Sequence, residues 1–194
     1  VAGAVAGDVF VSRCRFEGNE TGVLFAGSSD LSVSDSEFQR VGAPWGILLY
    51  TNSADNVIVR RCTFTQADEL DGPTGLAQFD GTLDVTIDAC VFVGGTLGVT
   101  FYGAEGSIGR LANCSIAGQT LNGLGVNGQT VDVVSCEFEG QSRAVYAFSP
   151  YWPLNITDTV FRNVTNYTFG IDYVGELNVH GCVLAHGPEY TFFQ

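Results

Sequence analysis

Short runs in which apolar and polar residues alternate recur along most of the chain. Residues 9–16, 57–64 and 131–138 are close copies of one eight-residue phrase, and about eight copies follow one another at steps of 22 to 28 residues. An apolar period of two is typical of strands, whereas a helix would repeat at three and four. A phrase that returns at such intervals is typical of a solenoid, so the pattern predicts a repeated β-architecture.

Alignment of the copies produces four apolar columns. The column taken as position zero holds Cys14, Ser36, Cys62, Cys90, Cys114, Cys136, Thr159 and Cys182. The column two places later holds Phe16, Phe38, Phe64, Phe92, Ile116, Phe138, Phe161 and Leu184. The positions three and five places before zero are aliphatic in every copy except at Gly109. Residues two apart on a strand share a face, so these columns predict ladders of inward side chains.

The odd gap between the third place before zero and zero itself predicts a bend between two strands. The residue just before zero is Asp35, Asn113 or Gly181 in some copies, and these types tolerate a left-handed backbone. A third apolar stretch follows each phrase, for example at residues 22–25 and 98–101. Each repeat is therefore predicted to contain three short strands. Residues 1–194 are predicted to form one all-β domain, a right-handed parallel β-helix of about eight coils.

The chain resembles the parallel β-helix repeat family of the pectate-lyase-like superfamily. The phrase at residues 14–19 with the following Gly22, and the phrase at residues 136–140, are similar to the family's repeat consensus. The resemblance covers essentially the whole chain and implies the fold. It implies no single function, because the family includes polysaccharide lyases, hydrolases, epimerases, phage tailspikes and adhesins.

The catalytic groups that the resemblance implies are not found in the expected arrangement. The family's hydrolases resemble one another in paired aspartates and a Gly-His-Gly segment, which neither His180 nor His186 reproduces. The family's lyases use a lysine or arginine base beside acidic, often calcium-bound residues, and this chain has no lysine. We therefore assign no catalytic or cofactor-binding residue, and the sequence favours a protein that is not an enzyme.

One polar column remains on a predicted outer face. Ser34, Arg60 and Asp88 stand two places before zero in successive copies, and His180 extends the same column. We interpret the column as a solvated sheet face, although it is also where a general base could stand. Asp35 and Asp88 are the carboxylates predicted to stack beside Arg60 and Arg61.

Composition narrows the classes of partner. The formal net charge is −13, with 21 acidic residues against eight arginines, so no basic stripe exists for nucleic acid. No apolar run is long enough to span a membrane. The six cysteines share the inward column and lack metal-ligand spacing. Two arrangements stay open for them, a reduced ladder and a ladder with one or two disulfide bridges.

Sequons for N-linked glycosylation are unusually frequent. Five are present, at Asn19, Asn113, Asn155, Asn163 and Asn166. Chance occurrence in a chain rich in Asn and Thr is the alternative. The sequons predict an extracellular or cell-surface glycoprotein carrying N-linked glycans.

Two further groups of residues are candidates for binding. Asp68, Glu69 and Asp71 place three carboxylates in one loop, which could hold Ca²⁺ or could be a solvated acidic loop. The aromatic residues of two other loops could contact a sugar or a partner, or could fold back over the coil; they are Trp45, Tyr151 and Trp152.

The sequence begins and stops within a coil, which predicts unpaired strand edges at both ends. We expect either flanking coils in a longer chain or protomers that stack end to end into a filament. Together these features predict a non-enzymatic structural or interaction glycoprotein of the cell surface or of an extracellular fibre. The alternative is a carbohydrate-active enzyme, similar to polysaccharide lyases or hydrolases, or a carbohydrate-binding adhesin.

Overall fold

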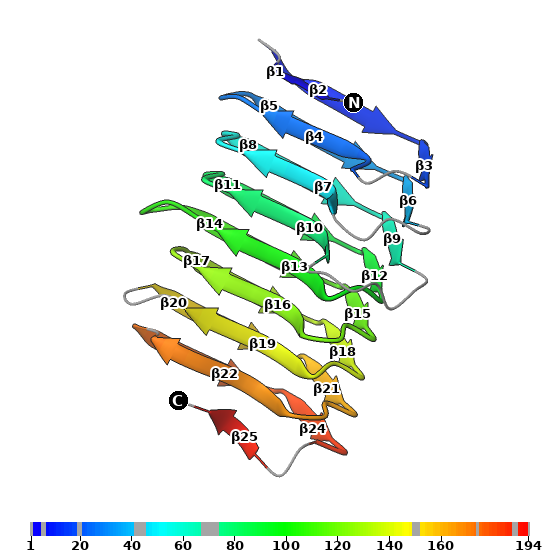
Figure 1. Ribbon diagram of the computed structural model, residues 1–194. Coiled ribbons are helices and arrows are strands. Elements are labelled where there is room, and N and C mark those ends of the chain that lie inside the picture. Colours follow the sequence, from blue (N-terminus) through cyan, green and yellow to red (C-terminus); the bar gives the residue numbers. More distant parts are fainter. Residues whose placement is uncertain are drawn as a thin grey trace.

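The computed structural model describes residues 2–4, 7–18, 21–40, 46–66, 74–148, 152–173, 175–187 and 190–193. Within these ranges every regular element is a β-strand, and the strands wind into a single column (Figure 1). All neighbouring strands pair in parallel, with one strand of each coil in each of three sheets. The predicted all-β solenoid with three strands per coil is confirmed.

The three sheets run the length of the column. Sheet A contains β1 (Ala2–Ala4), β4 (Val23–Ala26), β7 (Gly46–Asn52), β10 (Thr74–Asp80), β13 (Leu97–Tyr102), β16 (Asn122–Asn127), β19 (Arg143–Phe148), β22 (Tyr167–Tyr173) and β25 (Tyr190–Phe193). Sheet B contains β2 (Val9–Ser12), β5 (Asp30–Ser34), β8 (Asn56–Arg60), β11 (Asp84–Asp88), β14 (Ile108–Ala112), β17 (Thr130–Val134), β20 (Pro153–Thr157) and β23 (Glu176–His180). Sheet C contains β3 (Arg15–Glu17), β6 (Glu37–Arg40), β9 (Thr63–Gln66), β12 (Val91–Val93), β15 (Ser115–Ala117), β18 (Glu137–Glu139), β21 (Val160–Arg162) and β24 (Val183–Ala185).

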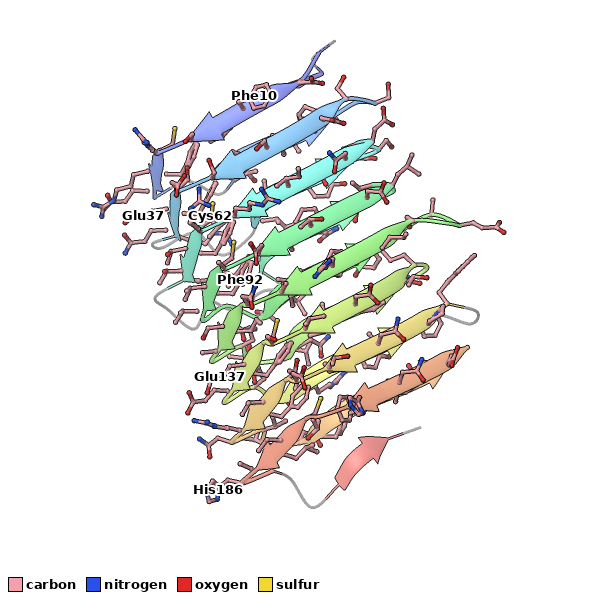
Figure 2. The ribbon with its side chains drawn as sticks, turned by 180° about the vertical axis from the view of Figure 1, so that it is seen from behind. Phe10, Glu37, Cys62, Phe92, Glu137 and His186 are labelled. Carbon is pink, nitrogen blue, oxygen red and sulfur yellow. The ribbon has the colours of Figure 1, made fainter. Side chains whose placement is uncertain are left out.

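The core consists of the predicted ladders. The rings of Phe16, Phe38, Phe64 and Phe92 stack face to face with centroids 4.6 to 4.8 Å apart, and Ile116 then takes the next rung. This spacing equals that of neighbouring strands, so each coil contributes one ring at the same height of the pleat. Figure 2, seen from behind, shows Glu37 and Glu137 along sheet C on the outside of the ladder that contains Phe92.

The bend between sheets B and C is left-handed in every coil. The eight residues just before position zero all have positive φ, between 49° and 67°. The sequence predicted this conformation only where Asn, Asp or Gly stands there, yet Arg61 and Ala89 adopt it too. Outward side chains at the bend pair across coils: Arg61 donates two hydrogen bonds to Asp35, at 2.6 and 2.9 Å, which lower the pKa of that carboxyl.

Gly109, the one break in the apolar columns, has a packing explanation. A Cβ atom built at Gly109 would lie 2.5 Å from Nε2 of Gln129 and 3.2 Å from the ring of Phe101. Both of these side chains are buried and fill the space that an aliphatic residue occupies in other coils. The repeat therefore changes at Gly109 because two larger neighbours replace its side chain.

The cysteines form a ladder of free thiols. Cys62, Cys90, Cys114 and Cys136 are buried, whereas Cys14 is exposed and Cys182 half-buried because they lie in the first and the last coil. The reduced arrangement is thus the one that the structure contains. Hydrogen bonding with Cys90 and burial raise the pKa of the Cys62 thiol, which makes it a poor nucleophile.

Candidate functional site

The outer face of sheet A is where aromatic and polar side chains gather. Strands β13, β16 and β19 lie side by side, and their outward positions align in columns across the sheet. In the central column Thr100, Gly125 and Tyr146 are register partners, and Tyr102 pairs with Asn127 in the next column. The alternate residues of β13, Val99 and Phe101, are buried in the core.

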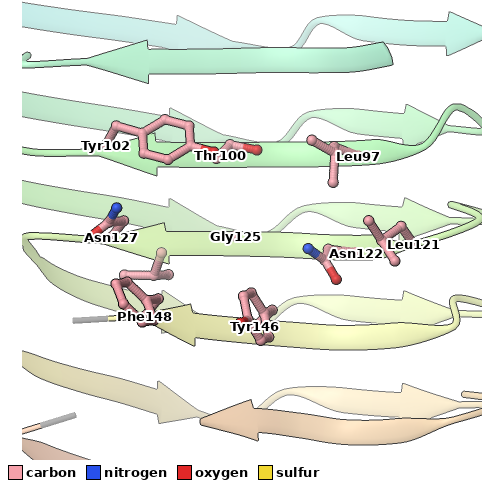
Figure 3. Close-up of a pocket in the computed structure, with 10 residues that line it drawn as sticks. Leu97, Thr100, Tyr102, Leu121, Asn122, Gly125, Asn127, Tyr146 and Phe148 are labelled. Atoms are coloured by element: carbon pink, nitrogen blue, oxygen red, sulfur yellow. The ribbon is translucent and has the colours of Figure 1, made fainter. Parts of the chain in front are cut away.

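A hollow of about 310 Å³ opens on this face, and we call it the aromatic hollow (Figure 3). Its lining consists of Leu97, Thr100, Tyr102, Leu121, Asn122, Gly125, Val126, Asn127, Tyr146 and Phe148. Gly125 lies in the middle of the hollow, with Thr100 on one side and Tyr146 on the other. Other coils have Tyr50 and Gln78 in this column, so the missing side chain of Gly125 creates the space.

Two rings on the rim are open to solvent. Tyr102 is 42% exposed and Phe148 is 47% exposed, which is high for large apolar side chains in a folded domain. The third ring, Tyr146, is fixed from two sides. Its hydroxyl donates a hydrogen bond to Asp172, and the guanidinium of Arg143 lies 5.2 Å from its ring centre. The hollow is therefore largely preformed.

A second tyrosine–carboxylate group flanks the aromatic hollow. Asp80, the register partner of Tyr102, accepts a hydrogen bond of 2.7 Å from the hydroxyl of Tyr50. Gln78 donates its amide to both oxygens of the same carboxylate, at 3.0 and 3.1 Å. Burial and the Asp80 hydrogen bond raise the pKa of Tyr50, and the Asp172 hydrogen bond and burial raise the pKa of Tyr146.

These carboxylates are too far apart for acid–base catalysis on one bond. Asp80 lies on β10 and Asp172 on β22, four strand spacings away, or roughly 19 Å. Glycoside hydrolysis uses carboxyl pairs about 5 to 9.5 Å apart. The described residues that line the hollow include no carboxylate, histidine or arginine. The arrangement can stack on an apolar surface and form neutral hydrogen bonds.

The predicted polar column lies on the outer face of sheet B. Ser34, Arg60 and Asp88 are successive register partners on β5, β8 and β11. His180 stands in the same column but is exposed at its far end, with three coils between it and Asp88. The column is thus confirmed, while its histidine and its central arginine are not brought together.

Four of the five sequons lie in the described residues. Asn113 is at the left-handed bend, Asn155 is on β20, and Asn163 and Asn166 lie in the connection from β21 to β22. The side-chain amides of the first three donate hydrogen bonds to carboxylates, namely those of Asp88, Asp132 and Glu139. Asn166 is exposed, and its backbone bonds to Ser142. Asn19 lies outside the described residues.

The remaining candidates lie mostly outside the described part of the chain. The acidic residues Asp68, Glu69 and Asp71 fall there, as do Trp45 and Tyr151. Trp152 is half-buried immediately before β20 and does not line the aromatic hollow. Elsewhere in the described ranges, no three His, Cys, Asp or Glu residues are grouped closely enough to hold a metal ion.

Sequence inspection missed the aromatic hollow. The residues that form it belong to the third strand of each coil, which is the least regular part of the repeat. A usable signal was present: Gly125 on β16 and Gly170 on β22 are both register partners of Tyr146 on β19. Small residues next to large ones on an outer face indicate a depression in that face.

Comparison with known protein families is consistent with the fold. Residues 2–92, slightly less than half of the chain, match a family model described as a right-handed beta helix region. The same register of three strands per coil continues through the second half, so the fold is a right-handed parallel β-helix throughout. Comparison with curated proteins and with solved structures found no match. No helix in the described ranges is long and apolar enough to cross a membrane.

Proposed function

We propose that this protein is a non-enzymatic interaction glycoprotein of the cell surface or of an extracellular fibre, and that the aromatic hollow binds a neutral sugar ring of its partner. The observation that carries the proposal is the exposed pair Tyr102 and Phe148 beside a preformed depression. Aromatic rings that expose an apolar face stack on the C–H face of a sugar.

Polar groups around the hollow are suited to hydroxyl groups. Asn127 supplies donors and acceptors without formal charge, and the buried Thr100 and Asn122 add further uncharged polar groups to the lining. An uncharged lining favours a neutral saccharide over an acidic one, because the protein carries a formal net charge of −13 that repels polyanions. The same lining argues against the alternative of a carbohydrate-active enzyme.

The test of this proposal is a calorimetric titration of the protein with neutral oligosaccharides of glucose, mannose and galactose. Phe148→Ala should weaken the best ligand about tenfold, since aromatic stacking contributes on the order of 1 kcal/mol beyond area burial. The matched control is Leu24→Ala, which removes a partly exposed side chain from the same face at β4. Equal losses in both variants, or no binding by the unaltered chain, would contradict the sugar site.

The enzyme alternative is tested on the same material. Incubation with neutral and acidic polysaccharides should produce no chain cleavage, and sustained cleavage would overturn the non-enzymatic proposal. The glycoprotein part is tested by intact mass before and after glycosidase treatment. At least two of Asn19, Asn155, Asn163 and Asn166 should carry sugar, and Asn166 should be the most completely occupied. An unchanged mass in native material would remove the argument for an extracellular location.

A further inference from the structure

A second pocket lies on the outer face of sheet B, away from the aromatic hollow. It has a volume of about 460 Å³ and is lined by Arg60, Thr86, Asp88, Arg110, Ala112 and Asn113. We call it the arginine pocket. Its residues come from β8, β11, β14 and the bend after β14, so three successive coils form it. Sheet B is the face that Figure 2 shows, with Phe10 on its first strand.

No carboxylate of the described residues lies within ion-pair distance of either arginine in this pocket. Arg15, Arg61 and Arg162, in contrast, form ion pairs with carboxylates of the described residues. In a protein with 21 acidic residues, two cations in one pocket without a carboxylate at ion-pair distance concentrate positive charge at that place. Guanidinium groups bind planar and tetrahedral oxyanions through several donors at once.

The shape of the pocket follows from one small residue. Ala112 is the register partner of Asp88 on one side and of Val134 on the other, and it is shorter than both. The depression that it leaves lies between Arg60, two coils away in the same column, and Arg110 on its own strand. Thr86, the register partner of Arg110, adds a hydroxyl donor.

The carboxylates around the pocket limit the charge of the ligand. Asp88 is part of the wall, with one oxygen accepting a hydrogen bond of 2.8 Å from the amide of Asn113. Asp132 is the next register partner of Arg110 and accepts a hydrogen bond from Asn155. Two arginines against Asp88 leave the lining with one net positive charge. The attraction of an anion to this lining grows in proportion to the anion's charge, whereas its desolvation cost grows with the square of that charge, so a weakly positive lining favours a monoanion over a dianion.

We propose that the arginine pocket is a binding site for a monoanionic oxyanion group, a carboxylate or a sulfate ester, held between Arg60 and Arg110. The site lies on a different sheet from the aromatic hollow and does not depend on the proposed sugar binding. A sugar attached to Asn113 would start in the wall of the pocket and close it. The site is therefore expected to be open in protein without a glycan at Asn113.

The experiment is an NMR titration of arginine Nε–Hε signals in unglycosylated protein at constant ionic strength. Methyl sulfate, acetate and, at alkaline pH, dianionic phosphate are the probes. Arg60 and Arg110 should shift together and saturate with methyl sulfate or acetate, and the better probe identifies the source chemistry. Phosphate dianion should bind at least about fivefold more weakly than the better monoanion.

Variants separate a built site from general attraction to surface cations. Arg60→Gln and Arg110→Gln should each weaken binding at least about fivefold, while Arg13→Gln, an exposed arginine in the first coil, should change nothing. Asp88→Asn keeps an oxygen for Asn113 and should both tighten binding and remove the preference against phosphate. Shifts that fail to saturate, shifts of equal size at Arg13, or an Asp88→Asn variant with unchanged preference would overturn the proposal.

Discussion

The aromatic hollow on sheet A and the arginine pocket on sheet B lie on different faces of overlapping coils, and each opens where a small residue interrupts a column of larger ones. Gly125 follows Tyr50, Gln78 and Thr100 in its column, and Ala112 follows Arg60 and Asp88. The backbone is the same in both places. What differs is the surrounding side chains, which are rings and amides on sheet A and charged groups on sheet B.

The difference shows how a solenoid acquires separate sites without extra domains. Inward columns must repeat because each rung packs on the next at one strand spacing. Outward positions have no such requirement, so one substitution to a small residue creates a depression and its neighbours decide the chemistry. The two sites share a core and nothing else, and this relation can be tested by three kinds of change.

The largest effect is expected from the shared core. Phe92 is fully buried and stacks on Phe64 with ring centroids 4.8 Å apart. Phe92→Ala should lower the free energy of unfolding by about 3 to 5 kcal/mol, because it removes buried apolar surface and leaves a cavity. Denaturant unfolding measures the loss. As denaturant is added to this variant, sugar binding and oxyanion binding should be lost together near the midpoint of its unfolding.

The matched control for this prediction is Val93→Ala at the next residue. Val93 points outward from sheet C and is 39% exposed, so its truncation should cost well under about 1 kcal/mol. A loss of similar size in both variants would show that the Phe ladder is not what holds the coils together. Loss of only one site in Phe92→Ala would show that the two sites do not depend on a common core.

Intermediate effects are expected from filling each depression with the residue of a neighbouring coil. Gly125→Thr copies Thr100, and its Cβ would lie 3.2 Å from Cγ2 of that residue, so a small local shift suffices. Ala112→Val copies Val134 in the same way. Each change should weaken its own ligand about tenfold and leave the other ligand unchanged. Calorimetry and the arginine NMR signals provide the two measurements.

Two results would contradict this description of the sites: an effect of one change on the ligand of the other site, or no effect of either change on its own ligand. If Gly125→Thr weakened oxyanion binding, the faces would be coupled through the core, and their description as independent sites would be wrong. If neither change affected its own ligand, the depressions would not be the binding sites. The unaltered stability of both variants, measured by denaturant unfolding, is the necessary control.

The inward half of this structure could be predicted from the sequence because every rung imposes the same constraint. The Phe and Cys columns, the three strands per coil and the bend before position zero were all visible as a pattern. Even there, the left-handed conformation of Arg61 and Ala89 was not visible, since neither type favours it. Stacking fixed by the neighbouring coils overrides the local preference at those two residues.

The outward half could be predicted only where residues happened to repeat. The column of Ser34, Arg60 and Asp88 follows from the alignment, but the pocket beside it depends on Arg110, which stands in another column and two coils away from Arg60. The aromatic hollow depends on Tyr146 and Phe148 from an irregular strand with a register shift after Ala147. These positions depend on the exact register of the third strand of each coil. The third apolar stretch of the repeat is too irregular to predict that register.

The smallest effect concerns pH and should appear on sheet A alone. The hydroxyls of Tyr50 and Tyr146 donate to Asp80 and Asp172, and these contacts together with burial raise the pKa of both phenols above the ordinary value of 10.0. The arginine pocket has no tyrosine in its lining, and arginine stays charged well above this range.

The sign follows from which form the folded state prefers. A raised phenol pKa means that the native state holds the proton more tightly than the unfolded chain, so the stabilisation is fully present below about pH 10. It is lost as the pH rises above 10 through the raised pKa, because the unfolded chain then releases protons that the native state retains.

Sugar binding should weaken over the same range as Tyr146 ionises beside Asp172, while methyl sulfate binding should stay constant. Tyr146→Phe combined with Tyr102→Phe keeps both rings and removes both phenol groups that line the hollow, so this double variant should make sugar binding independent of pH between about pH 8 and pH 11. If binding in the double variant still fell with pH, or if methyl sulfate binding fell in parallel, the alkaline effect would belong to the whole β-helix and not to the aromatic hollow.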